Sequence, residues 1–317
     1  MSVMQAIIQG IIQGLTEFLP VSSSGHLSLA QHFMGVKVES LLFDVMLHIG
    51  TLLAVLIVYR RLVWRLILSL FGLIRDVFTG RFHWRRMDPD RRLLMMLIIG
   101  LLPLFLLFLP VPGTGYRIKD YADLWATDND IVVEGCALVA TSVLLIFGII
   151  ATRRNSAAAR KSGGRSGRRS FHTADALCVG FAQCVAAVFP GLSRSGSTLS
   201  VGLMRGISRQ AALDYSFVLG IPAIIAAAAL ELKDAVHAPV AIGVAPLFAG
   251  ILSSAVVGFF AIKLLRWMVA SDRLGVFACY TMILGILVIV LGIIEHGTGV
   301  DFSLVKAAVA PLCALGF

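Results

Sequence analysis

Long apolar stretches separated by short polar segments dominate the hydropathy pattern of this chain. A helix needs about 20 consecutive apolar residues to cross a bilayer, and several stretches reach or approach that length. They are residues 41–59, 93–111, 131–151, 210–231, 243–265 and 276–294. The pattern therefore predicts an all-α integral membrane protein with about six transmembrane helices.

Two shorter apolar stretches, residues 3–19 and 174–190, differ from these spans. Each is too short and too polar for an ordinary crossing, and each ends at a proline, Pro20 or Pro190, followed by serines and a glycine. Proline ends a helix because it has no N–H and its ring collides with the preceding turn. Non-helical backbone inside a membrane must be enclosed by protein or line a polar cavity. We therefore predict two re-entrant helical hairpins with buried loops.

Residues 60–92 have a third pattern. They hold nine arginines, and their apolar part, residues 62–78, is interrupted by Arg65 and Arg75. This pattern is typical of an amphipathic helix that lies at the membrane interface, although a tilted span fits it as well. The apolar tail, residues 300–317, is too short to be placed.

Composition and charge agree with a membrane protein and predict its orientation. The 317 residues are 58% hydrophobic and 14% charged, whereas soluble domains carry about 25% charged residues. The net charge of +9 reflects topology rather than nucleic-acid binding, because lysine and arginine mark cytoplasmic loops. The basic segments 60–92 and 153–172 should therefore lie inside, and the acidic loop 112–130 outside. The first hairpin then opens outward and the second inward.

The two hairpins belong to an internal repeat. With their prolines aligned, Gly10 matches Gly180 and Gln13 matches Gln183, and the order continues through the serine-glycine loops to Gly50 and Gly220. Together with the loop charges, this predicts an inverted-topology repeat, which places a polar site near the membrane midplane. We expect one membrane domain over the whole chain. Its parts are repeat one (about 1–152), a flexible basic cytoplasmic linker (153–172), repeat two (about 173–295) and a tail (296–317).

The loop that follows Pro190 has the chemistry of a phosphate site. Its glycines leave backbone N–H groups free, and such groups bind phosphate at the start of a helix. The planar guanidinium of Arg194 can make paired hydrogen bonds to phosphate oxygens. The alternative is an arginine that only extends to the interface, which the neighbouring hydroxyls disfavour. The candidate residues of this loop are Ser193, Arg194, Ser195 and Gly196.

The helix before Pro20 carries a carboxylate at membrane depth. Glu17 and Gln13 are one turn apart on the same face. An intramembrane carboxylate is a functional candidate by default. With the help of Gln13, Glu17 could hold a divalent cation through oxygen; it could instead act as a general base.

The loop after Pro20 holds three hydroxyls, a glycine and a histidine. Serines are candidate nucleophiles, and histidine can supply acid-base chemistry. The alternative is that the serines only cap the following helix, which fits any single serine better than it fits the cluster. These residues are Ser22, Ser23, Ser24, Gly25 and His26.

Three further polar residues lie within the spans. His48 and Asp44 are four residues apart on the first span, and Asp214 is the counterpart of Asp44 in repeat two. Polar side chains at this depth often hydrogen-bond between helices. We expect such hydrogen bonding or ion pairing between helices, rather than direct chemistry, of these three.

The two loop motifs resemble those of a known family. Gln13-Gly-Leu-Thr-Glu17-Phe-Leu-Pro-Val-Ser-Ser-Ser-Gly-His26 and Pro190-Gly-Leu-Ser-Arg-Ser-Gly196 are similar to the motifs of the bacitracin-resistance-type undecaprenyl-diphosphatases. The similarity spans almost the whole chain. Members are integral membrane phosphatases that hydrolyse undecaprenyl diphosphate to the monophosphate, recycling the lipid carrier of peptidoglycan synthesis. Their overproduction confers resistance to bacitracin, which sequesters the diphosphate.

The resemblance also implies a site. Carried over by motif position, the catalytic set is Glu17, Ser23, His26 and Arg194, and Gln13 fills a position that holds Glu or Gln in the family. We expect the other loop residues to bind substrate; they are Ser22, Ser24, Gly25, Ser193, Ser195 and Gly196. A divalent cation, Mg²⁺ or Ca²⁺, is implied near Glu17 and Gln13. The resemblance also implies that the site faces the periplasmic side of the bacterial inner membrane.

The expected partners are a polyprenyl diphosphate and membrane lipid, not nucleic acid, and a homodimer is left open. Whether Ser23 or water attacks phosphorus is open as well. A transporter or flippase for a polyprenyl phosphate would fit the inverted repeat equally well, but it would release no phosphate. The acid-phosphatase superfamily is excluded, because it needs a second histidine soon after its Ser-Arg pair and none follows Arg194 within forty residues.

Overall fold

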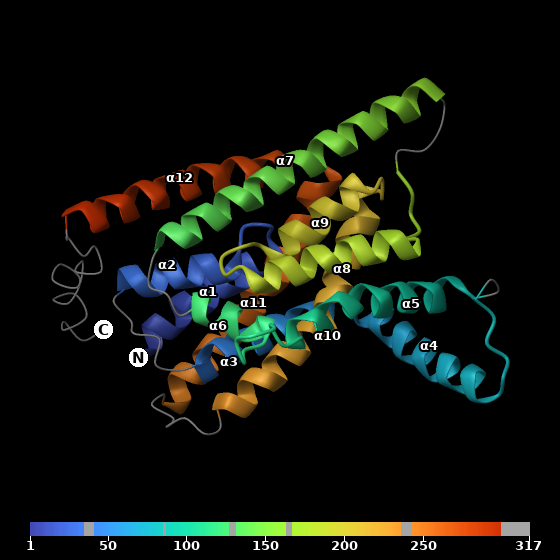
Figure 1. Ribbon diagram of the computed structural model, residues 1–317, viewed down its shortest axis with the longest axis horizontal. Helices are drawn as coiled ribbons and strands as arrows, with labels where there is room; N and C mark the ends of the chain where they lie inside the picture. The colour runs from blue at the N-terminus through green and yellow to red at the C-terminus, as the bar shows by residue number, and fades with distance from the viewer. Residues whose placement is uncertain (35–40, 85–86, 127–130, 163–166, 236–242, 299–317) are drawn as a thin grey trace.

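The computed structural model describes residues 1–317 except 35–40, 85–86, 127–130, 163–166, 236–242 and 299–317. Within these described ranges every named element is a helix (Figure 1). The elements are α1 (Val3–Phe18), α2 (Ser23–Met34), α3 (Leu41–Val58), α4 (Arg60–Phe78), α5 (Pro89–Leu101), the 3₁₀ helix η2 (Leu102–Phe108), α6 (Ile118–Ala126), α7 (Ile131–Ser162), α8 (Thr173–Val188), α9 (Arg194–Met204), α10 (Arg209–Ala235), α11 (Val244–Ala270) and α12 (Gly275–Thr298).

Several helices in the described part of the chain are long and apolar enough to cross a membrane. Five qualify, and α3 with α4 adds a sixth if this bent pair counts as one span. The five are α5 joined with η2, α7, α10, α11 and α12. The prediction of an all-α membrane protein with about six spans is therefore confirmed. The predicted tail 300–317 lies outside the described residues.

The two short helices end before their prolines, as predicted. α1 ends at Phe18 and α8 at Val188, each two residues before Pro20 or Pro190. The next residue is extended in both cases. α2 and α9 then begin a few residues beyond the prolines. Each repeat therefore contains a helix, a break and a second helix, with the serine-glycine motif at the break.

The predicted linker is wrong in its first half. α7 runs to Ser162 and so continues as a helix into the segment 153–172, which we expected to be a flexible loop. Residues 157–159 are alanines followed by arginine and lysine, all strong helix formers. No glycine or proline occurs between residues 149 and 162. Residues 163–166 lie outside the described part of the chain.

The helix α4 leaves α3 at an angle of 87° and is amphipathic. Leu66 and Leu73 are its buried residues, whereas Trp64, Phe71 and Phe78 are exposed by 62%, 65% and 87%. In Figure 1, α4 and α5 project together from the rest of the helices. The sharp bend and the exposed aromatic side chains agree with a helix at the membrane interface. The depth of α4 in the membrane stays a prediction.

Glycines that match between the repeats bring helices close together. A Cβ added to Gly10 of α1 would lie 2.6 Å from the carbonyl oxygen of Gly250 on α11. A Cβ added to Gly180 of α8 would lie 2.3 Å from the carbonyl oxygen of Gly100 on α5. Small residues allow such backbone approach between membrane helices. The shared glycines thus serve the same purpose in both halves, packing the broken helix against a span.

The main apolar core supports the end of α1. Phe18 is 3% exposed, and its ring meets Phe217 of α10 edge-to-face, with 5.5 Å between ring centroids. Phe217 also meets the ring of Tyr59 at the end of α3. Aromatic pairs of this kind add to the burial of the rings. Because Glu17 precedes Phe18, this packing holds the carboxylate in place.

Candidate active site

The two serine-glycine loops meet, as predicted. The Arg194 guanidinium pairs with the Glu17 carboxylate through Nη2 and Oε1. The Ser195 hydroxyl donates a hydrogen bond of 3.1 Å to the carbonyl oxygen of Leu19. A Cβ added to Gly25 would lie 3.5 Å from the Cα of Gly191. Residues about 170 positions apart in the chain therefore form one site.

Glu17 is the centre of this site. Its Oε2 accepts a hydrogen bond of 2.8 Å from the Ser23 hydroxyl and one of 3.1 Å from Gln13 Nε2, while Oε1 faces Arg194. The residue is only 5% exposed. Buried charges need a partner and hydrogen bonds to offset the loss of hydration, and Glu17 has both. The carboxylate is thus charged, oriented and in contact with a hydroxyl.

The first loop is held in a strained but well-bonded conformation. Ser22 has φ +73°, a left-handed conformation that costs a non-glycine residue about 1–3 kcal/mol. Its hydroxyl accepts the N–H of Gly25 at 3.2 Å. This bond secures the first turn of α2, so Ser23 projects toward Glu17. Ser24 is exposed and lies 3.5 Å from Ser22 between hydroxyl oxygens.

The second loop is built as a helix cap. Ser193 is the N-cap of α9, and its hydroxyl accepts the N–H of Gly196 at 3.0 Å. The N–H of Ser193 donates to the Thr141 hydroxyl on α7 at 3.1 Å, which attaches the loop to that span. Arg194 follows as the first residue of α9, and its side chain is 24% exposed. The guanidinium therefore lies at the positive end of a helix dipole, a favourable place for an anion.

His26 does not contact Glu17 or Ser23 through its ring nitrogens. Nδ1 donates to the carbonyl oxygen of Ser22 at 2.7 Å, and Nε2 lies 2.8 Å from the Tyr280 hydroxyl. The two rings stack with 5.6 Å between centroids. In neutral His26 this network puts the proton on Nδ1 and lets Nε2 accept from Tyr280. Tyr280 belongs to α12, and no motif in the sequence marked it.

His48 is the histidine nearest to the carboxylate. Its Nδ1 donates to the carbonyl oxygen of Asp44 at 2.8 Å, and its Nε2 lies 3.6 Å from Glu17 Oε2. The side chain is 34% exposed. The bond to Asp44 stays within α3, whereas the approach to Glu17 of α1 is a contact between helices of the kind expected for His48. Its approach to Glu17 could not be read from the sequence, where 31 residues separate the two.

The two span carboxylates bond to other side chains, as expected. Asp44 accepts from Gln31 Nε2 at 3.3 Å, and Asp214 accepts from the Tyr59 hydroxyl at 2.7 Å. These bonds join α3 to α2 and α10 to the end of α3. Asp44 and Asp214 therefore connect helices around the site.

Gly220 makes room for the arginine. A Cβ added there would lie 2.1 Å from Arg194 Nη1, so the guanidinium rests directly on the backbone of α10. The repeat alignment pairs Gly220 with Gly50, whose added Cβ would meet the Ser254 hydroxyl at 2.0 Å. The sequence showed that this glycine recurs but not what it faces.

The donor set around Glu17 suits a hard cation only in part. Gln13 is fully buried, and its Oε1 has no hydrogen-bond partner. An amide oxygen beside a carboxylate is a combination that Mg²⁺ and Ca²⁺ bind. In the described part of the chain, no three or more His, Cys, Asp or Glu side chains come together as a metal site. Protein ligands alone would thus be few, and substrate oxygens would have to add to them.

Comparisons with known proteins identify the family. The family model described as bacitracin resistance protein BacA matches residues 6–287. An undecaprenyl-diphosphatase of Methanosphaera stadtmanae is 35% identical, with 93% of this chain and 99% of the relative covered. Proteins of the same name from Methanobrevibacter smithii and Desulfosudis oleivorans are 36% and 38% identical. The alignments cover 93% and 90% of this chain and 99% and 97% of those relatives. The chain belongs to the bacitracin resistance protein BacA family.

Proposed function

We infer that this protein hydrolyses undecaprenyl diphosphate to undecaprenyl phosphate and inorganic phosphate. The observation that carries this inference is the contact of Glu17 with both Ser23 and Arg194, which joins the two motifs into one site. Full-length relatives named undecaprenyl-diphosphatase support it. The reaction returns the lipid carrier to peptidoglycan synthesis. It also removes the lipid that bacitracin sequesters, and so confers resistance.

Arg194 binds the diphosphate in this proposal. Its guanidinium is partly exposed and is already paired with a carboxylate, so a phosphate that enters can replace or share this partner in the same planar geometry. The N-terminus of α9 and the hydroxyls of Ser193 and Ser195 lie beside it. Phosphoryl transfer depends chiefly on positioning and electrostatic stabilisation, which these groups supply.

Ser23 is the proposed nucleophile and Glu17 its base. The hydroxyl already donates to Glu17 Oε2 at 2.8 Å, within the reach a general base requires. The Oγ–P bond forms at the terminal phosphorus while the bond to the bridging oxygen breaks, and the hydroxyl proton passes to Glu17. Undecaprenyl phosphate leaves. Water then hydrolyses the phosphoserine, which releases inorganic phosphate and restores Ser23.

His48 and His26 have different surroundings, and we therefore assign them different roles. His48, 3.6 Å from Glu17, is placed to balance the carboxylate charge and to exchange a proton with it. His26 is proposed to supply the proton for the leaving group. In the neutral ring the proton is on Nδ1, so Nε2 must first take up a proton from water and then exchange the hydroxyl of Tyr280 for a substrate oxygen.

A divalent cation completes the proposal. Glu17 and Gln13 would hold it through oxygen, since the buried Oε1 of Gln13 has no other partner. Mg²⁺ is commonly bound by one or two carboxylates together with substrate phosphates, which fits the small donor set. When bound, the cation would offset the negative charge of the diphosphate.

Orientation is part of the proposal too. The protein is a multi-pass membrane protein by its helices. We place it in the bacterial inner membrane with the site open to the periplasmic side, because the basic segments 60–92 and 153–172 favour the cytoplasm.

The test is phosphate release by the purified full chain in detergent micelles. With undecaprenyl diphosphate, inorganic phosphate should appear, and EDTA should stop its release until Mg²⁺ or Ca²⁺ is added back. If EDTA does not reduce the release of inorganic phosphate, the divalent cation has no place in the proposal. Movement of the lipid between leaflets with no phosphate release would identify a flippase instead. Acid-stable phosphoserine at Ser23 in a rapid quench would support covalent attack, whereas its absence during turnover would indicate attack by water.

A further inference from the structure

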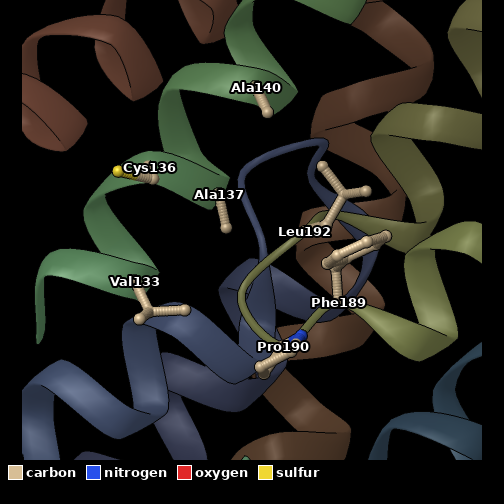
Figure 2. Close-up of a pocket in the computed structure, with 7 residues that line it drawn as sticks. All are labelled: Val133, Cys136, Ala137, Ala140, Phe189, Pro190 and Leu192. Carbon is tan, nitrogen blue, oxygen red and sulfur yellow. The ribbon is translucent and has the colours of Figure 1, made fainter. Parts of the chain in front are cut away.

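An apolar cavity lies beside the second loop, outside the polar site. It has a volume of about 550 Å³, within the range of about 300–1,000 Å³ common for small-molecule sites. Figure 2 shows it between α7 and the loop. The helix contributes Val133, Cys136, Ala137 and Ala140. The loop contributes Phe189, Pro190 and Leu192.

The cavity adjoins the loop that carries the proposed phosphate site. Leu192 in its wall directly precedes Ser193 and Arg194. On the opposite wall, Ala140 precedes Thr141, whose hydroxyl accepts the N–H of Ser193 at 3.1 Å. One loop therefore lines the cavity with Leu192 and carries Arg194 two positions later.

The side chains that line the cavity can bind only an apolar group. Apart from the thiol of Cys136, every lining side chain is hydrocarbon. Val133 and Phe189 are 39% and 48% exposed, and Cys136 is exposed as well. On a membrane-spanning helix, such a surface opens to lipid rather than to water. A long chain could thus enter from the bilayer and leave its remainder there.

Small residues create the space. Ala137 and Ala140 line the helix side, and the loop approaches them through Gly191, which has φ +78°. A Cβ added to Gly191 would lie 3.0 Å from the Cβ of Ala137. A larger side chain at Ala140 would occupy the cavity itself, whereas one at Val143, which is 38% exposed on the same helix, would lie outside the lining.

We propose that this cavity binds the isoprenoid segment next to the diphosphate of the substrate. The inference rests on the proposed function, because it assigns the anionic end to Arg194. It makes α7 and residues 189–192 the part of the protein that distinguishes a polyprenyl diphosphate from other diphosphates. An acyl chain of a membrane phospholipid is the competing occupant, and the experiment separates the two.

Cys136 reports on occupancy in the unmodified protein. The rate of its alkylation by N-ethylmaleimide, followed by mass spectrometry, should fall by about tenfold when undecaprenyl phosphate is present at about ten times its Kd, since only the unoccupied fraction of the protein can react. Cys178 and Cys279, which are also exposed and do not line the cavity, should react at unchanged rates. Equal rates with and without undecaprenyl phosphate would overturn the proposal. So would equal protection by dioleoyl phosphatidylglycerol, which would identify an acyl-chain groove.

A matched pair of variants tests the same point through turnover. A140F should lower kcat/KM for undecaprenyl diphosphate by about tenfold, mainly through KM, while V143F should match the parent. Both proteins should keep the parent Tm. If A140F has the same kinetics as the parent protein, the cavity proposal is contradicted, whereas the hydrolase function still stands. Conversely, protection of Cys136 without any phosphate release would leave the cavity assigned and the hydrolase function refuted.

Discussion

At the scale of single residues, the site depends on a few directed contacts around one buried carboxylate. Glu17 accepts from Ser23 and Gln13 and pairs with Arg194. The pair with Arg194 depends on the charge of the carboxylate, and the bond from Ser23 ends on an oxygen that can accept a proton. Substitutions that remove the charge but keep the shape of the side chain are therefore the most informative.

Glu17→Gln keeps the shape of the side chain and removes its charge. If Glu17 is the base for Ser23, kcat should fall by about 10²–10⁴-fold at a nearly unchanged Tm. Initial rates of phosphate release and a thermal melt measure the two quantities. Turnover within a few-fold of the parent would exclude Glu17 as the base.

Arg194→Lys keeps the charge and removes the planar pair of donors. Loss of one hydrogen bond to a charged group costs about 1.5–3 kcal/mol, so kcat/KM should fall by roughly 10–100-fold. The same assay measures it, with R169K as the control at an exposed arginine away from the loops. A variant with nearly full activity would show that Arg194 acts as a point charge only.

Gly220→Ala should separate activity from stability. The added Cβ would lie 2.1 Å from Arg194 Nη1, which is the movable end of a long side chain, so the arginine should be displaced while the helix stays intact. Alanine is also the better helix former by about 1 kcal/mol. We expect a strong loss of phosphate release with a Tm equal to or above that of the parent. A fall in Tm with normal activity would contradict the assigned contact.

At the scale of elements, close helix packing supports the broken helices. The glycines of α1 lie against the backbone of α11, and Gly180 of α8 lies against α5. Backbone cannot move aside as a side chain can. Substitutions at these positions should therefore affect folding first and chemistry second, the reverse of Gly220→Ala.

Gly14→Ala tests this distinction. Its Cβ would lie 2.7 Å from the carbonyl oxygen of Ser254 and 2.9 Å from the N of Gly258. Overpacking of this kind costs about 1–3 kcal/mol, which should appear as a lower Tm in detergent. Gly275→Ala is the matched control, because no atom lies within 4 Å of its added Cβ. Equal melting temperatures for the two variants would show that α1 and α11 can separate at little cost.

At the scale of the whole molecule, the orientation in the membrane decides where substrate arrives. The charge pattern places residues 112–130 outside and 153–172 inside. Two exposed residues in these segments, Thr114 and Ser170, can carry a reporter. Their relative accessibility distinguishes the proposed orientation from its inverse.

A cysteine added at one of these positions should react differently from one added at the other in intact cells. A membrane-impermeant maleimide should label T114C but not S170C, and both should be labelled after the cells are broken. The parent protein, which has five native cysteines, provides the background. Labelling of S170C alone in intact cells would invert the protein and place the site on the cytoplasmic side.

Local signals in the amino-acid sequence are enough to locate the helical elements and the breaks between them. Apolar stretches of 17–25 residues and the residues that interrupt them are local signals, so the spans and the ends of α1 and α8 were predicted closely. The sequence does not predict the continuation of α7 to Ser162. The basic residues and glycines of segment 153–172 are typical of a linker, and they obscure the helix propensity of its alanines. Motif resemblance also identified Glu17, Ser23 and Arg194, which the structure brings together.

Which side chains meet depends on how the helices pack together. Glu17 and Arg194 are 177 residues apart, and their contact requires two hairpins to converge. The closeness of His48 to Glu17, the pairing of His26 with Tyr280 and the fit of Gly220 under Arg194 arise between separate helices. So does the apolar cavity beside the second loop. A local pattern specifies how a segment folds and which face is apolar, but helix rotation and crossing, set by packing across the whole bundle, determine what that face touches.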